Sequence, residues 1–262
     1  MRARHVAMAV VIMAVLGTAA CSPGPSTRAS TGAPAPASAP GSSPGASAPA
    51  SAPGSSQGRL RDGLLTAARL PQGFLLMTEQ INATTTGAPH APASTVPIAS
   101  MPCTELGVES FVPRHARPLE DVAVGLERQL ATDTIEDGGV DDSWFGQEVL
   151  DRYAPGQAAA VMSAVRDAAG RCPSYTTTYA DGDHGVETVT VAPADVPADD
   201  GLVLRISTVM PGSADPFISE SAFVREGDVI LTVQKIGSQR PRAGVEAVLA
   251  PAVAAYRATT RG

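Results

Sequence analysis

This sequence is poor in lysine, cysteine, aromatic residues and long apolar runs. Lysine occurs once, at Lys235, and the aromatic residues make up only 4% of the 262 residues. The formal net charge is −7, and the isoelectric point is near 5.1. A nucleic-acid-binding protein usually has a basic patch and a high isoelectric point, so the composition argues against that class. The longest strongly apolar run falls well short of the roughly 20 residues that a membrane-spanning helix needs.

The first 21 residues predict a secretory signal that ends in a lipidated cysteine. A short basic start precedes the apolar run 6–16. A run of that length is too short to cross a bilayer but fits the core of a signal peptide. The small residues Gly17 to Ala20 directly precede Cys21, an arrangement that resembles the lipobox of bacterial lipoproteins. We expect a signal peptide over 1–20 and acyl chains such as palmitate on Cys21; an ordinary cleavage site is the alternative.

The segment that follows the lipidated cysteine predicts a disordered linker, so that 21–58 acts as a tether. Residues 22–58 consist almost only of Ala, Pro, Ser, Gly and Thr, without an acidic or aromatic residue. Such a segment cannot bury enough apolar area to offset its chain entropy. Its sequence also repeats, because 37–43 recurs as 50–56. A flexible chain of this length spans on the order of 30–35 Å, which would hold a domain away from the extracellular face of the cell membrane.

Residues 59–262 form the one remaining domain, and this domain is strongly acidic. All 26 acidic residues fall in it, whereas three of the 19 basic residues, Arg2, Arg4 and Arg28, precede it. Its net charge is therefore −10. The length is sufficient for one core of ordinary size. The negative charge favours solubility and disfavours docking to anionic lipid.

Periodicity predicts an α+β fold with a mainly antiparallel sheet, flanked by two longer helices and a short N-terminal helix. The short helix is expected over 60–70. One longer helix opens at Pro155 and ends at Pro173, and the other covers 244–259. Alternating and β-rich stretches predict strands at 121–132, 144–153, 175–179, 186–191, 202–209, 222–225 and 229–236. The last two strands flank a predicted three-residue turn, Glu226-Gly227-Asp228.

The acidic domain contains two of the three cysteines of the chain. If Cys21 carries lipid, Cys103 and Cys172 remain as an even pair in an exported domain, where a disulfide is chemically allowed. The bond would close a loop of about 70 residues, with a nominal stabilisation of roughly 4 kcal/mol. A free thiol pair and a metal site are the alternatives, but no C-x-x-C and no histidine at ligand spacing accompany the cysteines. We favour the disulfide and expect no metal.

The order of these features resembles a known family of sensor domains. A Leu/Pro start over 64–74 is followed by the loop cysteine Cys103, an Ala-rich helix that ends in Cys172-Pro173, and a late hairpin over 223–233. This order is similar to the extracellular sensor domain of mycobacterial PknH-type receptor kinases and to its lipoprotein relatives in actinobacteria. The resemblance implies an antiparallel sheet backed by helices, with a cleft and a ligand-sensing role. It brings no catalytic residues, and because no kinase domain is present, any signal would pass through a partner.

Sequence motifs of catalysis are missing from the chain. The G-x-S-x-G, H-E-x-x-H, G-x-G-x-x-G and Walker patterns do not occur. His90, His115 and His184 are far apart in sequence, and isolated loop histidines are more often solvated than catalytic. We therefore expect a non-enzymatic protein without a cofactor. An envelope hydrolase or transferase that uses His184 with a nearby acid is the alternative.

Two features of the domain are candidates for binding. Trp144 and Phe145 are an adjacent aromatic pair, which is more often core than ligand platform but could line a ligand cleft. The segment before them carries an acidic cluster of four residues, which is either a solvated loop or a surface for a cation or a basic partner: Glu136, Asp137, Asp141 and Asp142.

The sequence as a whole predicts a non-catalytic lipoprotein at the cell membrane. Its N-terminal lipid would hold it in the membrane, and its extracellular domain would bind an unidentified envelope ligand or protein. Nucleic acid is not an expected partner. A structural scaffold that binds an envelope protein through the acidic cluster is a further alternative.

Overall fold

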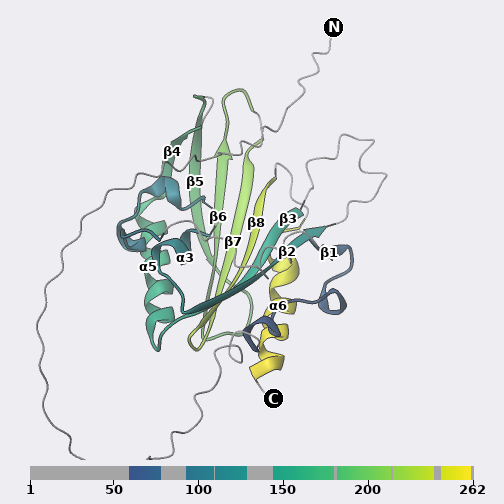
Figure 1. Ribbon diagram of the computed structural model, residues 1–262. Helices are drawn as coiled ribbons and strands as arrows, with labels where there is room; N and C mark the ends of the chain where they lie inside the picture. Colours follow the sequence, from purple (N-terminus) through teal and green to yellow (C-terminus); the bar gives the residue numbers. More distant parts are fainter. Residues whose placement is uncertain are drawn as a thin grey trace, which may run out of the picture. The chain divides into compact units, whose positions relative to one another are not determined.

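Eight antiparallel strands form a single sheet in the computed structural model (Figure 1). The structure describes residues 59–77, 93–108, 110–128, 144–179, 182–213, 215–238 and 243–260. The chain divides into two units, Met1–Ala48 and Pro49–Gly262, and every described residue belongs to the second unit. The predicted signal peptide, the lipidated Cys21 and the tether therefore lie outside the described residues.

The strand order across the sheet is β1-β2-β3-β8-β7-β6-β5-β4, and every neighbouring pair is antiparallel. The strands are β1 Phe74–Leu76, β2 Glu120–Arg128, β3 Trp144–Arg152, β4 Ser174–Thr178, β5 His184–Pro193, β6 Asp200–Val209, β7 Phe217–Glu226 and β8 Val229–Ser238. The predicted α+β class with a mainly antiparallel sheet agrees with this architecture. The pairing of β3 with β8 joins the two halves of the sheet, and no local sequence pattern predicts it.

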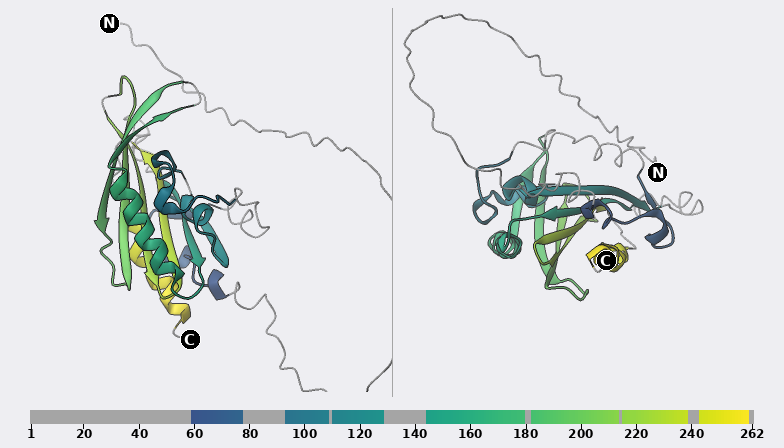
Figure 2. Two further views of the ribbon diagram at one scale, coloured as in Figure 1. Left: turned by 90° about the vertical axis from the view of Figure 1, so that its left-hand side faces the viewer. Right: turned by 60° about the horizontal axis from the view of Figure 1, so that its bottom comes forward.

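Two helices of 15 residues lie on opposite faces of the sheet. They are α5, Gln157–Arg171, and α6, Glu246–Thr260. The right-hand view of Figure 2 shows strands of the sheet passing between the two helices. The shorter elements are η1 Ala67–Arg69, η2 Ile98–Ser100, η3 Cys103–Glu105 and α3 Phe111–His115.

The predicted N-terminal helix over 60–70 is not formed as one helix. The chain is helical only up to Arg61 and again in η1. The Leu65 N–H, which a continuous helix would direct to the Arg61 carbonyl, donates instead to Glu148 Oε2 at 2.7 Å. Gly63 also lies so close to the Tyr256 ring of α6 that an added Cβ would be 2.9 Å from it. Tertiary contacts with β3 and α6 therefore replace the local helix that the apolar periodicity favours.

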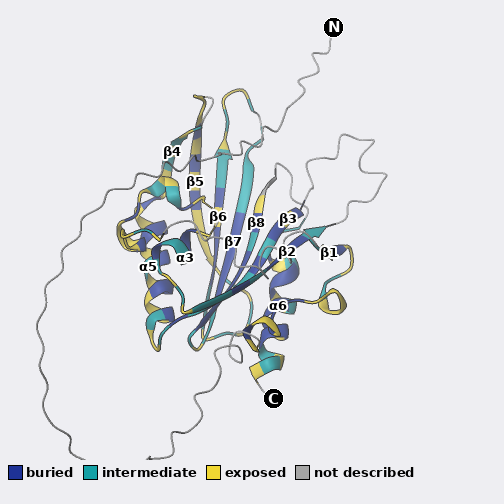
Figure 3. Cartoon of the chain, in the orientation of Figure 1, coloured by how far each residue is buried: buried dark blue, intermediate teal, exposed yellow. Residues whose placement is uncertain are grey.

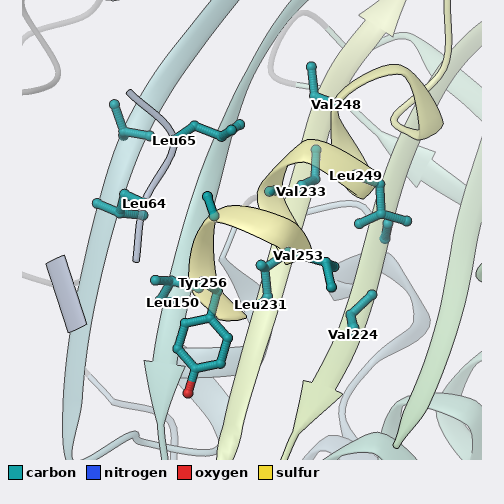
Figure 4. Close-up of a cluster of buried hydrophobic side chains, with 14 of the residues drawn as sticks. Leu64, Leu65, Leu150, Val224, Leu231, Val233, Val248, Leu249, Val253 and Tyr256 are labelled. Atoms are coloured by element: carbon teal, nitrogen blue, oxygen red, sulfur yellow. The ribbon is translucent and has the colours of Figure 1, made fainter. Parts of the chain in front are cut away.

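Each face of the sheet supports its own apolar core. On the α6 face, Leu231 and Val233 of β8 pack with the helix residues Leu249 and Tyr256, as the close-up in Figure 4 shows. On the α5 face, the core combines buried positions of α5, β5–β8, η2 and α3. Figure 3 shows that buried residues concentrate in the middle strands and that exposure increases toward β4 and β5. The strands β7 and β8 are therefore buried on both faces in their middle, over residues 220–224 and 229–233.

The hairpin between β7 and β8 is tighter than the sequence predicts. Glu226 pairs with Val229, so the loop has the two residues Gly227 and Asp228 rather than three. Gly227 has a φ of +61°, which glycine adopts without steric cost and which suits the first central position of a two-residue hairpin. The predicted strand over 121–132 ends at Arg128, and residues 129–132 lie outside the described residues.

Buried polar groups fasten the start of α6 to the sheet. Glu220 Oε2 accepts the Val245 N–H at 3.2 Å, and its other oxygen accepts Arg205 Nε at 2.6 Å. Lys235 Nζ, on the strand opposite Glu220, donates to the Ala243 carbonyl at 3.0 Å. These contacts fix the N-terminal end of the helix against β7 and β8.

Candidate binding site

A small hollow lies between the sheet and α3, on the face that also carries α5. Its roof consists of Ser110 and the first turn of α3, which contributes Phe111, Val112 and Pro113. Its floor consists of seven side chains from three adjacent strands: Gln147, Val149 and Asp151 of β3, Thr232 and Gln234 of β8, and Ser221 and Phe223 of β7. The hollow has about 20 Å³ of free volume, which is room for about one water molecule.

A disulfide and a set of hydrogen bonds hold the roof segment, residues 93–116, on the sheet. The disulfide joins Cys103 to Cys172 at the end of α5, with the two Cα atoms 5.5 Å apart. Arg171 donates to the Met101 carbonyl at 2.9 Å. The buried ring of His115 lies between two oxygen acceptors, the Val96 carbonyl at 2.6 Å and Glu105 Oε2 at 2.7 Å. The roof is thus attached to α5 and braced within itself.

The floor of the hollow is mostly polar, and the alternation of β3 directs two of its polar side chains, Gln147 and Asp151, to this face. Gln147 Nε2 donates to Gln234 Oε1 on the neighbouring strand at 3.3 Å and to Ser110 Oγ of the roof at 3.4 Å. Ser221 and Thr232 are buried beside them. The amide of Gln147 therefore links floor and roof at one side of the hollow.

Asp151 is the most unusual side chain of the floor. It is 1% exposed, and its Oδ1 has no hydrogen-bond partner among the described residues. Asp121 of β2 lies directly opposite it in the strand register. Burial, and secondarily the negative charge of Asp121, raises the pKa of Asp151 to about 8. Near neutral pH the group is therefore mainly the neutral carboxylic acid.

Two further residues add to the polar character of this region. Tyr153 is buried, and its hydroxyl has no hydrogen-bond partner among the described residues. Burial raises the pKa of Tyr153, and the charges of Asp151 and Asp121 raise it further. Ser110 has a φ of +60° and is the one described residue other than glycine in the left-handed region. Backbone strain of this kind concentrates at ligand and active sites, which makes the Ser110 end of the roof a functional candidate.

The structure does not bring the predicted aromatic pair, Trp144 and Phe145, into one cleft. Trp144 faces the α6 core, where it is 1% exposed and packs edge-on against Phe74 with the ring centroids 5.1 Å apart. Phe145 points to the opposite face of β3 and is 43% exposed. Neither residue lines the hollow beneath α3. Adjacent residues of a strand point to opposite faces, so the pair could not share a pocket once this segment formed a strand.

The predicted polar residues of the domain have separate positions. The exposed His184 contacts Thr178 across the β4–β5 hairpin, with 3.0 Å between Nδ1 and Oγ1. His115 belongs to the roof of the hollow, as described above. Five further candidates lie outside the described residues: His90, Glu136, Asp137, Asp141 and Asp142. The described contacts thus supply no carboxylate partner for His184, as the hydrolase alternative would require.

Sequence reasoning missed Asp151 and Ser110. One signal for Asp151 was available, because an acidic residue stands between the apolar Leu150 and Tyr153 in a predicted strand. Alternation along that strand places Asp151 on the same face as Gln147 and Val149. Nothing local could show that this face would be covered, since the covering segment lies more than 30 residues earlier in the chain.

The described residues contain no helix that is long and apolar enough to cross a membrane. Within the same residues, no group of three or more His, Cys, Asp or Glu side chains could hold a metal ion.

Comparisons with known proteins give one structural neighbour to report. No family model matches the chain, and no curated protein sequence matches it. A solved structure, the extracellular domain of PknH from Mycobacterium tuberculosis, aligns with 76% of this chain and 98% of its own length. The sequence identity is 13% and the TM-score is 0.43. The neighbour belongs to the PknH type that the sequence resembles, and a similarity at this level identifies no ligand, anchor or activity for this chain.

Proposed function

We propose that this chain is an exported, lipid-anchored protein whose acidic domain binds a ligand or a protein partner outside the cell without catalysing a reaction. The observation that carries the proposal is the hollow beneath α3. The Cys103–Cys172 disulfide ties its roof to α5, and its floor contains the buried Asp151, whose Oδ1 has no hydrogen-bond partner in the described part of the chain. A disulfide persists in oxidising compartments, and a concave site with a few polar groups is typical of ligand binding.

The anchoring part of the proposal rests on the N-terminal sequence. The apolar run, the small residues before Cys21 and the tether over 22–58 together suit a domain presented at the extracellular face of the membrane. Metabolic labelling with an alkyne analogue of palmitate tests it in a bacterial host that processes lipoproteins. The wild-type chain should be labelled and sediment with membranes, whereas Cys21→Ser should be unlabelled. Ser22→Ala, a change at the neighbouring residue, is the matched control and should be labelled like the wild type.

Two results would contradict the anchoring part. One is equal labelling of Cys21→Ser and the wild type. The other is a native protein that is recovered from the cytosol with both Cys103 and Cys172 reduced. Thiol alkylation before and after reduction distinguishes these states, because disulfide-bonded cysteines react only after reduction.

The binding part is tested by thermal unfolding of the full-length chain with envelope fragments, and by cross-linking in native membranes. A ligand at one hundred times its dissociation constant adds about 2.7 kcal/mol to the stability, which raises Tm by several degrees for a domain of this size. A reproducible rise with one class of compound, or one specific cross-linked protein, supports a binding role. If no compound raises Tm and no protein is cross-linked, the binding part fails.

A further inference from the structure

The strand β4 forms one edge of the sheet and pairs with a neighbour, β5, on one side only (Figure 1). Two hydrogen bonds show which backbone groups face that neighbour. The Val189 N–H donates to the Pro173 carbonyl at 3.0 Å. At the other end of the strand, the Tyr179 N–H donates to the Asp183 carbonyl at 2.8 Å. Because hydrogen-bonded and non-hydrogen-bonded pairs alternate along an antiparallel ladder, the odd-numbered residues of β4 direct their backbone groups toward β5.

The even-numbered residues of β4 direct their N–H and C=O groups away from the sheet: Ser174, Thr176 and Thr178. Within the described part of the chain, these outward groups have no hydrogen-bond partner. The roof segment does reach β4, but it lies over the α5 face, where a Cβ added to Gly107 would be 3.6 Å from the Tyr175 hydroxyl oxygen. The edge therefore offers the backbone groups that another strand needs.

The usual protections of a free edge are missing from β4. Lysine, proline, a β-bulge or a very short strand keeps an edge from pairing with another chain. β4 has the sequence SYTTT, five residues are an ordinary strand length, and its register with β5 has no shift. Its side chains are uncharged, although the domain has a net charge of −10. An approaching strand therefore meets neither a charge nor a missing N–H donor in β4.

The sequence of this edge is complementary to itself. When two antiparallel copies of β4 meet with Thr176 opposite Thr176, Ser174 of each copy lies opposite Thr178 of the other. Every outward residue then has a counterpart, and each such pair exchanges two backbone hydrogen bonds, about six in all. The register places the three side chains on the α6 face, where Thr–Thr and Ser–Thr pairs across strands are favourable. This alignment also gives the longest overlap of the two strands.

We propose that two copies of this chain associate through β4 about a two-fold axis, so that their sheets continue into each other. The inference goes beyond the proposed function and does not require the anchor. A second copy suits the edge better than a basic peptide, because no acidic side chain lies on the α6 face of β4 or β5 to attract one. One strand pair is a small contact compared with the roughly 1,200–2,000 Å² of a stable interface, so we expect association at high local concentration.

Cysteine cross-linking in intact cells tests the pairing and its register. Two residues in such a hydrogen-bonded pair have Cα atoms about 5.5 Å apart, which suits a disulfide. Ser174, in contrast, would lie about 13 Å along the strand from its own counterpart. The full-length chain is expressed in a host that processes lipoproteins, the cells are treated with copper phenanthroline as oxidant, and cells and medium are analysed on non-reducing gels.

Thr176→Cys should form a covalent dimer, at least about tenfold more than Ser174→Cys or Thr178→Cys alone, because only the central residue meets its own counterpart. Co-expression of Ser174→Cys with Thr178→Cys should give the cross-link that neither variant gives alone. An intact Cys103–Cys172 disulfide, measured by thiol alkylation, shows that each variant is folded.

A charge at the centre of the edge provides a second test. Thr176→Lys, introduced into both co-expressed chains, places two like charges opposite each other at the axis and should abolish their cross-link. Thr190→Lys, at an exposed position of β5 on the same face, is the matched control and should preserve it.

Four outcomes would overturn the inference: no dimer of Thr176→Cys, an equal amount of dimer from a flanking variant alone, a cross-link that survives Thr176→Lys, or a cross-link of Thr176→Cys to a different protein in place of itself. The last outcome would show that a foreign strand occupies the edge. None of the four removes the label from Cys21 or a ligand-dependent rise in Tm, so the pairing and the proposed function fail separately.

Discussion

Replacing Asp151 with asparagine should change how the stability of the domain depends on pH. In the folded protein the pKa of Asp151 is raised from 3.8 to about 8, mainly by burial, whereas in the unfolded chain the group has its ordinary pKa. Between these two values the folded protein holds a proton that the unfolded chain has released. The stability contributed by this proton is fully present below pH 4 and is lost as the pH rises toward 8.

The magnitude follows from the interval between the two pKa values. One such group changes the free energy of unfolding by ~1.4 kcal/mol per pH unit, so the full loss is on the order of 5 kcal/mol. This is comparable with the total stability of an ordinary domain, about 5–15 kcal/mol. Asp151→Asn removes the titration. It should match the wild type near pH 4 and exceed it by several kcal/mol at pH 8.

Urea unfolding at pH 4, 5, 6, 7 and 8 measures the effect, with the fluorescence of the single tryptophan, Trp144, as the probe. Glu148, on the other face of β3, also has its pKa raised to about 8 by burial, so the variant should retain part of the pH dependence. Glu246→Gln, at a half-exposed position, is the control and should follow the wild type. If the wild type and Asp151→Asn give parallel plots of unfolding free energy against pH, the assignment of a raised pKa to Asp151 is refuted.

Three further substitutions test the contacts that hold the fold. Replacing both Cys103 and Cys172 with serine should lower the free energy of unfolding by about 4 kcal/mol in urea titrations, because the disulfide spans 69 residues; a loss below about 1 kcal/mol would contradict this. Glu220→Ala should lower the free energy of unfolding by about 2–4 kcal/mol, because it removes the oxygen that accepts the Val245 N–H at the start of α6. The half-exposed control Glu246→Ala should change it by less than about 0.5 kcal/mol. Equal losses in the two variants would refute the role given to Glu220. His115→Ala should lower the free energy of unfolding by about 2 kcal/mol, because the ring contacts the Val96 carbonyl and Glu105 within the roof segment. It should also speed proteolytic cleavage within 93–108. An unchanged cleavage pattern would show that the ring does not brace the roof.

The strands and the cysteine pair of this domain could be predicted from the sequence. The signals for the strands are local, and two cysteines allow only one intramolecular pair. Alternation along 144–153 and 186–191 predicts strands that the structure contains as β3 and β5. Pro173 predicts the C-terminal end of α5, and the helix ends at Arg171 with Cys172 as its C-cap residue. Two cysteines in one acidic domain that is predicted to be exported leave a single intramolecular pairing, so no knowledge of the fold was needed to propose it.

The candidate site could not be predicted from the sequence in this way, because it is assembled from segments far apart in the chain. Ser110 and Gln147 meet across 37 residues, and Gln147 meets Gln234 across 87. The pairing of β3 with β8 that brings these residues together depends on long-range register, and single-strand patterns carry no information about it. The same limitation explains the missing N-terminal helix, since Glu148 captures the Leu65 N–H from a distance of 83 residues.

The central strands β7 and β8 separate two apolar cores, and their side chains contribute to both. This arrangement determines which positions of the domain tolerate polar substitutions. In a sheet with one wet face, every second position accepts polar substitutions. Here Ala222 and Val224 face one core while Phe223 faces the other, so three successive positions of β7 are closed to polar side chains. Variation among functional sequences should therefore be suppressed along the whole middle of these strands, while β5, with its alternating exposed positions, retains the freedom to diverge.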